Sequence, residues 1–238
     1  MKIKFNEILV SIVIFSLLIT LGMNISDAIN SSLLNKYQEY NTAVKISDNK
    51  ELFEYALRTN VGNAFIYGDL IAVDPIVIDD ISGSYAYIER EEQHYQRHSR
   101  TVTYTDSDGK THTKTEYYWQ WDTVDTDSWH CSKLSFLGVT FKYDQISLPR
   151  ARYLTTINSG YHVRYLYYVN DTKYIGTIYT NINNNTINNT KFYDNKNIID
   201  VIAKLKSRWE IYLFWSIWIV LSIAIVITFC YLDNRWLD

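Results

Sequence analysis

The sequence predicts an α+β membrane protein: a β-rich antiparallel extramembrane domain flanked by helices, with one or two transmembrane helices. Three observations carry this prediction. An apolar segment lies near each end of the 238-residue chain, the region between them alternates as strands do, and aromatic residues are abundant, with 21 Tyr and 7 Trp. Tyr and Trp favour strands and membrane interfaces, whereas disordered chains are poor in aromatic residues.

The first apolar segment, Ile8–Met23, lies within residues 1–23 and follows Lys2 and Lys4. It is short for a bilayer span, which needs about 20 residues, so two interpretations stay open. The segment is a retained anchor extended by the helix after it, or a signal peptide cleaved after Ser26-Asp27-Ala28. We favour the anchor because the helical pattern continues without a break. The two lysines then favour a cytoplasmic N-terminus, with the central region outside.

The second apolar segment, residues 211–232, contains no charged residue. A helix of this length extends about 33 Å at about 1.5 Å per residue, enough to cross the hydrocarbon core. Aromatic residues gather at both of its ends, as in the belts of membrane helices. They are Trp209, Tyr212, Trp215, Trp218, Tyr231 and Trp236. The pattern predicts a transmembrane helix followed by a short tail, residues 233–238.

Between the apolar segments, the periodicity changes from helical to strand-like. Apolar residues recur every three or four positions from Ile29 to Val44, and Asp48-x-x-Glu51 resembles a capping box that begins a second helix. We therefore expect a helical, membrane-proximal segment over 24–62. Residues 63–194 are predicted to be a β-rich domain of roughly seven to nine strands, arranged as an antiparallel sheet, a barrel or a sandwich.

Two hairpins are the clearest features of this domain. The first has the turn Asp106-Ser107-Asp108-Gly109, and the second has Asn170-Asp171. Asn181–Thr190 is expected to be a polar loop. The expected strands are 64–73, 76–78, 85–98, 101–104, 111–121, 134–141, 162–169, 173–180 and 191–193.

Residues 195–210 are predicted to form a basic amphipathic juxtamembrane helix. Its Lys204, Lys206 and Arg208 are candidate contacts to anionic headgroups. The alternative is a helix packed on its own domain, with these charges in solvent. The three residues would themselves prefer the cytoplasm, against the orientation that the N-terminal lysines favour.

No motif of a nucleophile elbow, P-loop, zinc protease or dinucleotide site occurs in the sequence. We therefore predict no enzyme activity, no catalytic or cofactor-binding residue and no cofactor. The net charge of −3 and the absence of an arginine-rich stripe exclude a nucleic-acid footprint. The acidic run Glu89-Arg90-Glu91-Glu92 is expected to alternate between two strand faces instead of forming a catalytic carboxylate pair.

Metal sites are also not predicted. The histidines near residues 94–130 and Cys131 are ligand types, but they do not recur at a zinc spacing. These histidines are His94, His98, His112 and His130. Asp106–Gly109 hints at a calcium loop, yet Tyr104 stands where a ligand would be needed. Cys131 is the single cysteine of the middle domain and is expected to be a small, half-buried residue.

Tyr117-Tyr118-Trp119-Gln120-Trp121 is the most unusual stretch of the chain. On a strand, Tyr117, Trp119 and Trp121 share one face and form a candidate interaction surface. Core or interface packing is the favoured use of such a ladder, and stacking on sugar rings is the alternative.

Six short sequence motifs follow one another between Gly68 and Pro149: Gly68-Asp69-Leu70, Asp74-Pro75, Tyr87–Arg90, His94-Tyr95-Gln96, Tyr118–Trp121 and Phe136–Val139. Their order resembles the extramembrane domain of LUMA-type membrane proteins and, more distantly, the beside-a-membrane domain of membrane-anchored ubiquitin ligases. The chain is also similar to two-span membrane proteins of low-GC Gram-positive bacteria. The LUMA resemblance covers about a third of the chain and implies a scaffold role, although LUMA-type proteins have more spans. It supplies no catalytic residue.

The sequence thus predicts a non-enzymatic, membrane-anchored interaction or scaffold protein with its β-rich domain beside the bilayer. Its expected partners are the membrane and another protein, and its expected place is the cell membrane, with the central domain on the extracytoplasmic side. A cell-envelope glycan-binding module that uses Trp119 and Trp121 and a membrane enzyme of unrecognised type are the alternatives. The oligomeric state and any small-molecule ligand are not predicted.

Overall fold

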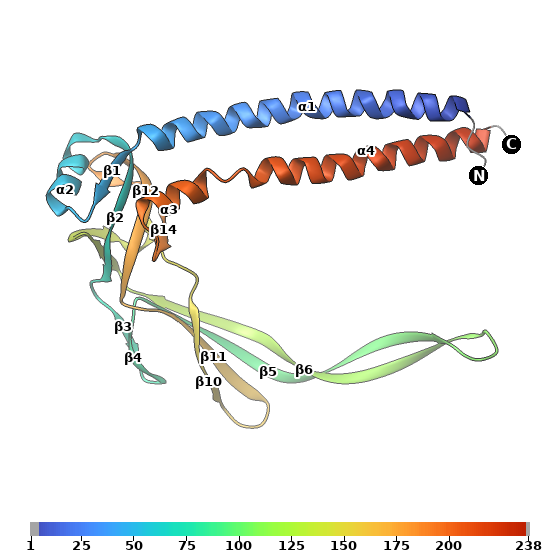
Figure 1. Ribbon diagram of the computed structural model, residues 1–238. Helices are drawn as coiled ribbons and strands as arrows, with labels where there is room; N and C mark the ends of the chain where they lie inside the picture. The colour runs from blue at the N-terminus through green and yellow to red at the C-terminus, as the bar shows by residue number, and fades with distance from the viewer. Residues whose placement is uncertain (1–4, 237–238) are drawn as a thin grey trace. The chain divides into compact units, whose positions relative to one another are not determined.

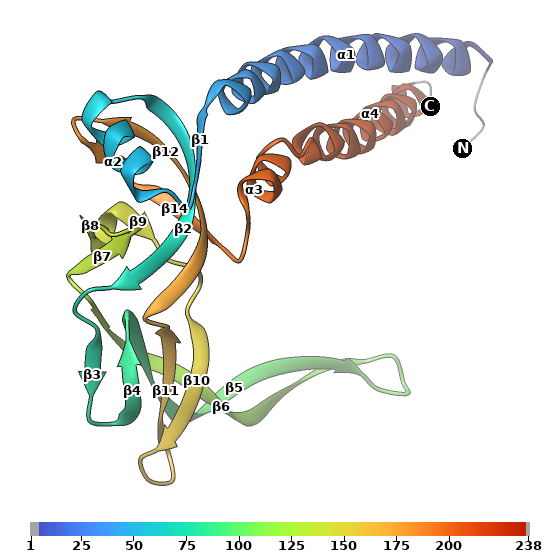
Figure 2. The same ribbon diagram turned by 60° about the vertical axis from the view of Figure 1, so that its left-hand side comes forward.

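The computed structural model describes residues 5–236 and consists of two compact units. One unit is helical and contains both ends of the chain, up to Ala43 and from Ile199 onward; the other, Val44–Ile198, is β-rich. Figures 1 and 2 show the two ends as long blue and red helices and the middle of the chain as sheet. The predicted mixed α+β composition with a β-rich centre is confirmed.

Three helices build the helical unit: α1 (Phe5–Thr42), α3 (Ile198–Leu205) and α4 (Trp209–Trp236). Helix α1 runs without interruption from the first apolar segment through the predicted membrane-proximal helix. The predicted juxtamembrane helix is shorter than expected, because residues 206–208 leave helical geometry before α4 begins. Two of the described helical stretches, Ile8–Thr42 and Ile198–Leu232, are long and apolar enough to cross a membrane.

Helices α1 and α4 pack side by side in opposite directions (Figures 1 and 2). The indole N–H of Trp218 donates to the carbonyl of Leu18 at 3.0 Å, and Trp215 donates to Ser26 Oγ at 3.2 Å. Gly22 permits this approach, because a Cβ there would lie 2.4 Å from the Trp218 indole nitrogen. Small residues at helix contacts commonly allow such close packing in membranes.

The larger sheet of the β-rich unit has eight strands in the order β8-β7-β2-β12-β14-β9, with β1 added to β2 and β13 to β12. Two pairings are parallel, β1 with β2 and β14 with β9, so the expected antiparallel arrangement is wrong at these two pairings. The strands are β1 (Val44–Ser47), β2 (Gly62–Ala72), β7 (Lys133–Phe136), β8 (Val139–Lys142), β9 (Ile146–Ser147), β12 (Lys173–Asn183), β13 (Thr186–Ile187) and β14 (Thr190–Asp194).

The core of this unit lies between the larger sheet and helix α2 (Lys50–Thr59). Phe53 of α2 is fully buried, and its ring lies 5.9 Å from the ring of Phe136 and 6.0 Å from that of Phe141. Phe136 in turn meets Phe192 edge to face at 6.2 Å. Edge-to-face rings at these distances stabilise a core beyond the burial of their area. This aromatic cluster joins α2 to strands that lie far apart in the sequence.

The second sheet has four antiparallel strands in the order β10-β11-β5-β6. They are β10 (Arg152–Asn158), β11 (Val163–Asn170), β5 (Tyr87–Thr105) and β6 (Thr111–His130). A short hairpin, β3 (Ile76–Ile78) with β4 (Ile81–Tyr85), supplies the residues that cover one face of this sheet. On that face Ile88 is buried, and Arg90 pairs with Asp127 at 2.6 Å. Successive side chains of Glu89-Arg90-Glu91-Glu92 therefore alternate between the two faces of the strand, as predicted.

Several predicted elements are wrong in detail. Residues 134–141 form the hairpin β7–β8 instead of one strand, with Leu137 and Gly138 in left-handed geometry at φ 47° and 75°. Asn181–Thr190 is not a loop, because β12 continues to Asn183 and pairs with β13 across a turn made by Asn184 and Asn185. Asparagine adopts the left-handed region more readily than most residues, which suits it to this turn.

The predicted helical segment 24–62 is interrupted by a strand. Val44 does not end the first helix but begins β1, which pairs with β2. The second helix is capped by Asn49 instead of Asp48: the Asn49 side chain accepts from the backbone N–H of Leu52 at 2.8 Å. Asp48 instead has a positive φ of 48° and donates its N–H to the Tyr67 carbonyl.

Candidate functional site

Strands β5 and β6 extend well beyond the sheet to which they belong (Figure 1). Strand β11 pairs with β5 only from Tyr87 to His94, whereas β5 and β6 stay paired to the end of the hairpin. We call residues 95–121 the ribbon. No other described strand pairs with it, so its edges are open beyond Tyr95, whose backbone N–H donates to the carbonyl of His162 at 2.9 Å. Two-stranded ribbons are marginally stable in isolation, and open edges invite a pairing partner.

One side of the ribbon is aromatic, as the alternation predicts. Tyr117, Trp119 and Trp121 lie on this side, and Tyr95 of β5 lies between the two indoles, with ring centroids 5.3 Å from Trp119 and 5.2 Å from Trp121. Tyr117 and Trp119 remain 61% and 52% exposed. The three sequence-predicted interaction residues are thus brought together on one face, and they are not part of either hydrophobic core.

Two arginines complete this side. The Arg97 guanidinium lies 3.9 Å from the ring centroid of Tyr117, and that of Arg164 lies 4.2 Å from the ring centroid of Trp121. Arg164 also donates twice to the side-chain oxygen of Gln93, at 2.9 and 2.7 Å. We call Tyr95, Arg97, Tyr117, Trp119 and Trp121 the aromatic face. The face combines Tyr, Trp and Arg, the residue types that dominate binding energy at protein interfaces.

The opposite side of the ribbon is mainly polar, with Tyr118 and Tyr104 stacked on His98 and His112. His98 bonds to Asp122, and His112 bonds to Asp106 at 2.6 Å. Arg100 and Lys114 both form ion pairs with Glu116. Each histidine here therefore has a separate carboxylate partner, and the described residues contain no cluster of three or more candidate metal ligands.

The turn at Asp106–Gly109 is the tip of the ribbon, which confirms the hairpin interpretation. One carboxylate oxygen of Asp106 accepts from the backbone N–H groups of Asp108 and Lys110, at 3.0 and 2.9 Å. The other accepts from His112. Both oxygens of Asp106 are therefore engaged in the turn itself.

Cys131 is buried at 1% exposure, deeper than the sequence predicts. Burial and the nearby Asp74 carboxylate raise the pKa of its thiol to about 11. Since the thiolate is the nucleophilic form, this environment does not equip Cys131 for nucleophilic chemistry near neutral pH.

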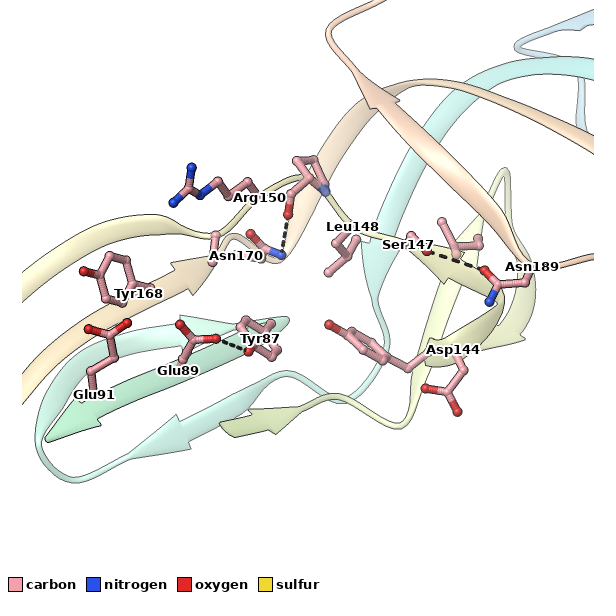
Figure 3. Close-up of a pocket in the computed structure, with 14 residues that line it drawn as sticks. Tyr87, Glu89, Glu91, Asp144, Ser147, Leu148, Arg150, Tyr168, Asn170 and Asn189 are labelled. Atoms are coloured by element: carbon pink, nitrogen blue, oxygen red, sulfur yellow. Dashed lines mark hydrogen bonds between the residues drawn. The ribbon is translucent and has the colours of Figure 1, made fainter. Parts of the chain in front are cut away.

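A cavity of about 620 Å³ opens beside the base of the second sheet, within the range of small-molecule sites. Figure 3 shows Glu89 and Glu91 projecting from β5 to the same side, with Tyr168 of β11 next to them. The far wall comes from the segment of η1 (Tyr143–Gln145), β9 and the chain that leads to β10. It contributes Tyr143, Asp144, Ser147, Leu148, Pro149 and Arg150.

The cavity lies on the same side of the second sheet as the aromatic face. Glu89, Glu91, Gln93 and Tyr95 alternate along β5, so their side chains point the same way. The side chain of Gln93 donates to Glu91 at 3.4 Å while it accepts from Arg164. A single strand therefore presents two adjacent surfaces, one acidic and concave, the other aromatic and basic.

The tyrosines of the cavity are held in their neutral form. Burial raises the pKa of Tyr143 to about 12, and burial together with a 2.6 Å hydrogen bond to Glu89 raises that of Tyr87 to about 12. Burial, followed by Glu91 and Glu89, also raises the pKa of Tyr168. These phenols can donate hydrogen bonds at neutral pH but cannot act as bases there.

The basic residues predicted to contact headgroups lie in different elements and have different surroundings. Lys206 donates to the side chain of Asn41 on α1, whereas Lys204 and Arg208 are exposed. Lys204 lies in α3, and Arg208 lies in the break before α4. At least one of the three cations thus stabilises the helical unit itself.

No protein family model matches the chain, and no curated protein or solved structure shows a significant match to it. The resemblance to LUMA-type proteins, based on short sequence motifs between Gly68 and Pro149, therefore stays a prediction.

Sequence reasoning found the aromatic side of β6 but missed the residues that complete it. Tyr95 and Arg97 could have been found, because they alternate on β5 opposite Trp121 and Trp119. The cavity carries no comparable signal. Its walls come from β5, β11, the segment 143–151 and Asn189, which only the fold brings together.

Proposed function

We propose that this chain is a non-enzymatic, membrane-anchored binding protein whose aromatic face contacts another protein. The observation that carries the proposal is an exposed set of Tyr, Trp and Arg residues on a ribbon that no described strand covers. Exposed aromatic patches of this kind mark interaction sites in soluble domains. The helices α1 and α4 would serve as the membrane anchors of this domain.

The aromatic rings of this face are partly covered by other side chains, which favours contact with protein over contact with sugar. Sugar binding uses a free, flat aromatic surface. Here one side of Tyr117 is covered by Arg97, one side of Trp121 is covered by Arg164, and Tyr95 stacks between the indoles. Arginine held over an aromatic ring is pre-organised for protein contacts, because the stack lowers the entropy lost on binding.

The proposed place is the cell membrane, with the β-rich domain on the extracytoplasmic side. Lys2 and Lys4 precede the first apolar segment, and such residues favour the cytoplasm. The tip of the ribbon should then be cleaved by protease added to intact cells. Cleavage at 106–110 only after lysis would reverse the orientation. The mature N-terminus should lie at or near Met1, and a chain that begins at Ile29 would leave only α4 as the anchor.

The binding proposal is tested by site-specific photo-crosslinking of the full chain in its native membrane. A photoreactive phenylalanine analogue at Trp119 should capture one defined protein. The same analogue at the adjacent Gln120, on the opposite side of β6, is the matched control and should not capture it. Equal capture from both positions, or none from either, would contradict the proposal. Retention on envelope glycans that is lost in Trp119→Ala and Trp121→Ala would instead establish the glycan-binding alternative.

A further inference from the structure

The acidic cavity is a second candidate site, independent of the aromatic face. It has three carboxylates, those of Glu89, Glu91 and Asp144, and one guanidinium, that of Arg150. Among the described residues, no lysine, arginine or histidine forms an ion pair with any of the three carboxylates. Other acidic residues of the second sheet do have such partners, as Arg90 with Asp127 shows.

The arrangement of Arg164 explains why Glu91 lacks a cation. Arg164 on β11 lies opposite Gln93 on β5. Gln93 is two residues from Glu91, so the side chains of Gln93 and Glu91 are on the same side of the sheet. Its guanidinium is instead stacked over Trp121 and bonded to Gln93. Gln93 therefore stands between the Arg164 guanidinium and Glu91, and Arg164 forms no ion pair with the Glu91 carboxylate.

An unpartnered acceptor inside the cavity wall points to the same chemistry. Asn170 lines the cavity and is 96% buried, since only 4% of it is exposed. Its amide nitrogen donates to the carbonyl of Pro149 at 3.1 Å, but its side-chain oxygen has no hydrogen-bond partner. Buried polar atoms are nearly always paired in folded proteins, so this oxygen is an acceptor in the cavity wall that no described donor of the chain satisfies.

The described lining of the cavity thus has three carboxylates against the single guanidinium of Arg150, and it offers aromatic surface. Tyr87, Tyr143 and Tyr168 contribute three phenol rings to its walls. Organic cations are attracted to such rings, and ammonium and guanidinium groups carry only donors and no acceptor. A carboxylate accepts a guanidinium through two parallel hydrogen bonds, a particularly favourable geometry.

We propose that the cavity between β5, β11 and the 143–151 segment binds an organic cation, a guanidinium or primary ammonium group, through Glu89 and Glu91. The cation is either a free small molecule or a basic side chain of a bound polypeptide. The two sources share the same recognition chemistry, and separate probes distinguish them.

The test uses isothermal titration calorimetry on the full chain in lipid nanodiscs, at about 150 mM salt so that non-specific attraction is screened. The probes are agmatine and a blocked Gly-Arg-Gly peptide, with Gly-citrulline-Gly as the uncharged isostere. At least one cation should bind, and the citrulline peptide should bind at least tenfold more weakly than its arginine counterpart. Stronger binding of agmatine would identify a free amine compound as the ligand, and stronger binding of the peptide would identify a polypeptide side chain.

The double variant Glu89→Gln/Glu91→Gln should weaken binding at least tenfold. Glu92→Gln is the matched control, because Glu92 is adjacent on β5 but lies on the opposite side, where it bonds His94. It should leave binding unchanged. If the double variant does not fold, Glu91→Gln alone serves, since Gln93 is the described side-chain partner of Glu91. The proposal is overturned if neither cation binds, if citrulline binds equally, or if Glu92→Gln weakens binding as much as Glu91→Gln.

Discussion

The larger sheet and the ribbon use aromatic residues in opposite ways. In the larger sheet, Phe53, Phe136 and Phe192 are at most 2% exposed and hold α2 against the strands. On the ribbon, Tyr117 and Trp119 are more than half exposed: Tyr117 lies under Arg97, and Trp119 stacks on Tyr95 and His162. Apolar burial is the main stabilising term in folding, so the first set explains why the domain folds. The second set contributes little to that burial and must be explained by function.

The largest expected effect is in the core of the larger sheet. Phe136→Ala should lower the free energy of unfolding by about 3–5 kcal/mol, because it removes a fully buried ring and leaves a cavity between Phe53 and Phe192. Hydrogen-exchange mass spectrometry on the full chain should show faster exchange throughout β2, β7 and β12. A change confined to β7 would mean that the sheet is not one cooperative unit.

A substitution at Gly176 provides a sharper test of the same sheet, because it adds a methyl group and deletes no existing contact. A Cβ at this position would lie 2.3 Å from the backbone carbonyl oxygen of Tyr193 on β14 and 2.9 Å from the Phe192 ring. Gly176→Ala should therefore cost about 1–3 kcal/mol by forcing β12 and β14 apart. Gly62→Ala is not a matched control, because Gly62 has a positive φ of 82°. Denaturant unfolding that places Gly176→Ala at wild-type stability would contradict the close β12–β14 contact.

The sequence predicts the ribbon better than the larger sheet, because the two regions differ in how local their contacts are. The ribbon depends on local alternation and a local turn, so Tyr117, Trp119 and Trp121 could be placed on one side from the sequence alone. The larger sheet depends on pairings between distant segments. Strand β2 lies between β12 and β7, and no spacing pattern in one sequence specifies such neighbours.

The strands next to two unusual turns, β7–β8 and β12–β13, could not be predicted from the sequence. Leu137 adopts a positive φ of 47° and fills the space above Gly68, where a Cβ would lie 2.4 Å from its side chain. Because a leucine in left-handed geometry is uncommon, the hairpin β7–β8 was not expected. The asparagine-rich stretch before Thr190 likewise appears polar, although Ile182 and Ile187 within it are each 1% exposed.

On the ribbon, removal of an aromatic ring should affect binding far more than folding. Trp119→Ser deletes an indole that is 52% exposed and stacks on Tyr95, so the free energy of unfolding should change by about 1 kcal/mol or less. Capture of the partner from a crosslinker placed at Tyr117 should be lost. A loss of stability as large as that of Phe136→Ala, measured by the same exchange experiment, would mean that the aromatic face is part of the folding core.

The smallest expected effect on stability concerns the helical unit. It tests whether exposed residues there, like those of the aromatic face, serve contacts outside the fold instead of stabilising it. Exposed charges contribute little to folding, so Arg208→Gln should leave thermal unfolding unchanged. Lys206→Gln should differ, because it weakens the bond to Asn41 that joins the chain before α4 to α1.

Membrane composition then separates headgroup contact from packing in this unit. Each cation near an anionic surface contributes about 1 kcal/mol at most, and salt screens it within about 8–10 Å. Lys204→Gln with Arg208→Gln should therefore loosen the tilt of the domain, measured by site-directed spin labels, in anionic nanodiscs at low salt. The loosening should be smaller at high salt, where the wild-type contact is already screened, and absent in neutral nanodiscs. Equal effects in neutral and anionic lipid would mean that these charges act within the protein, as Lys206 does.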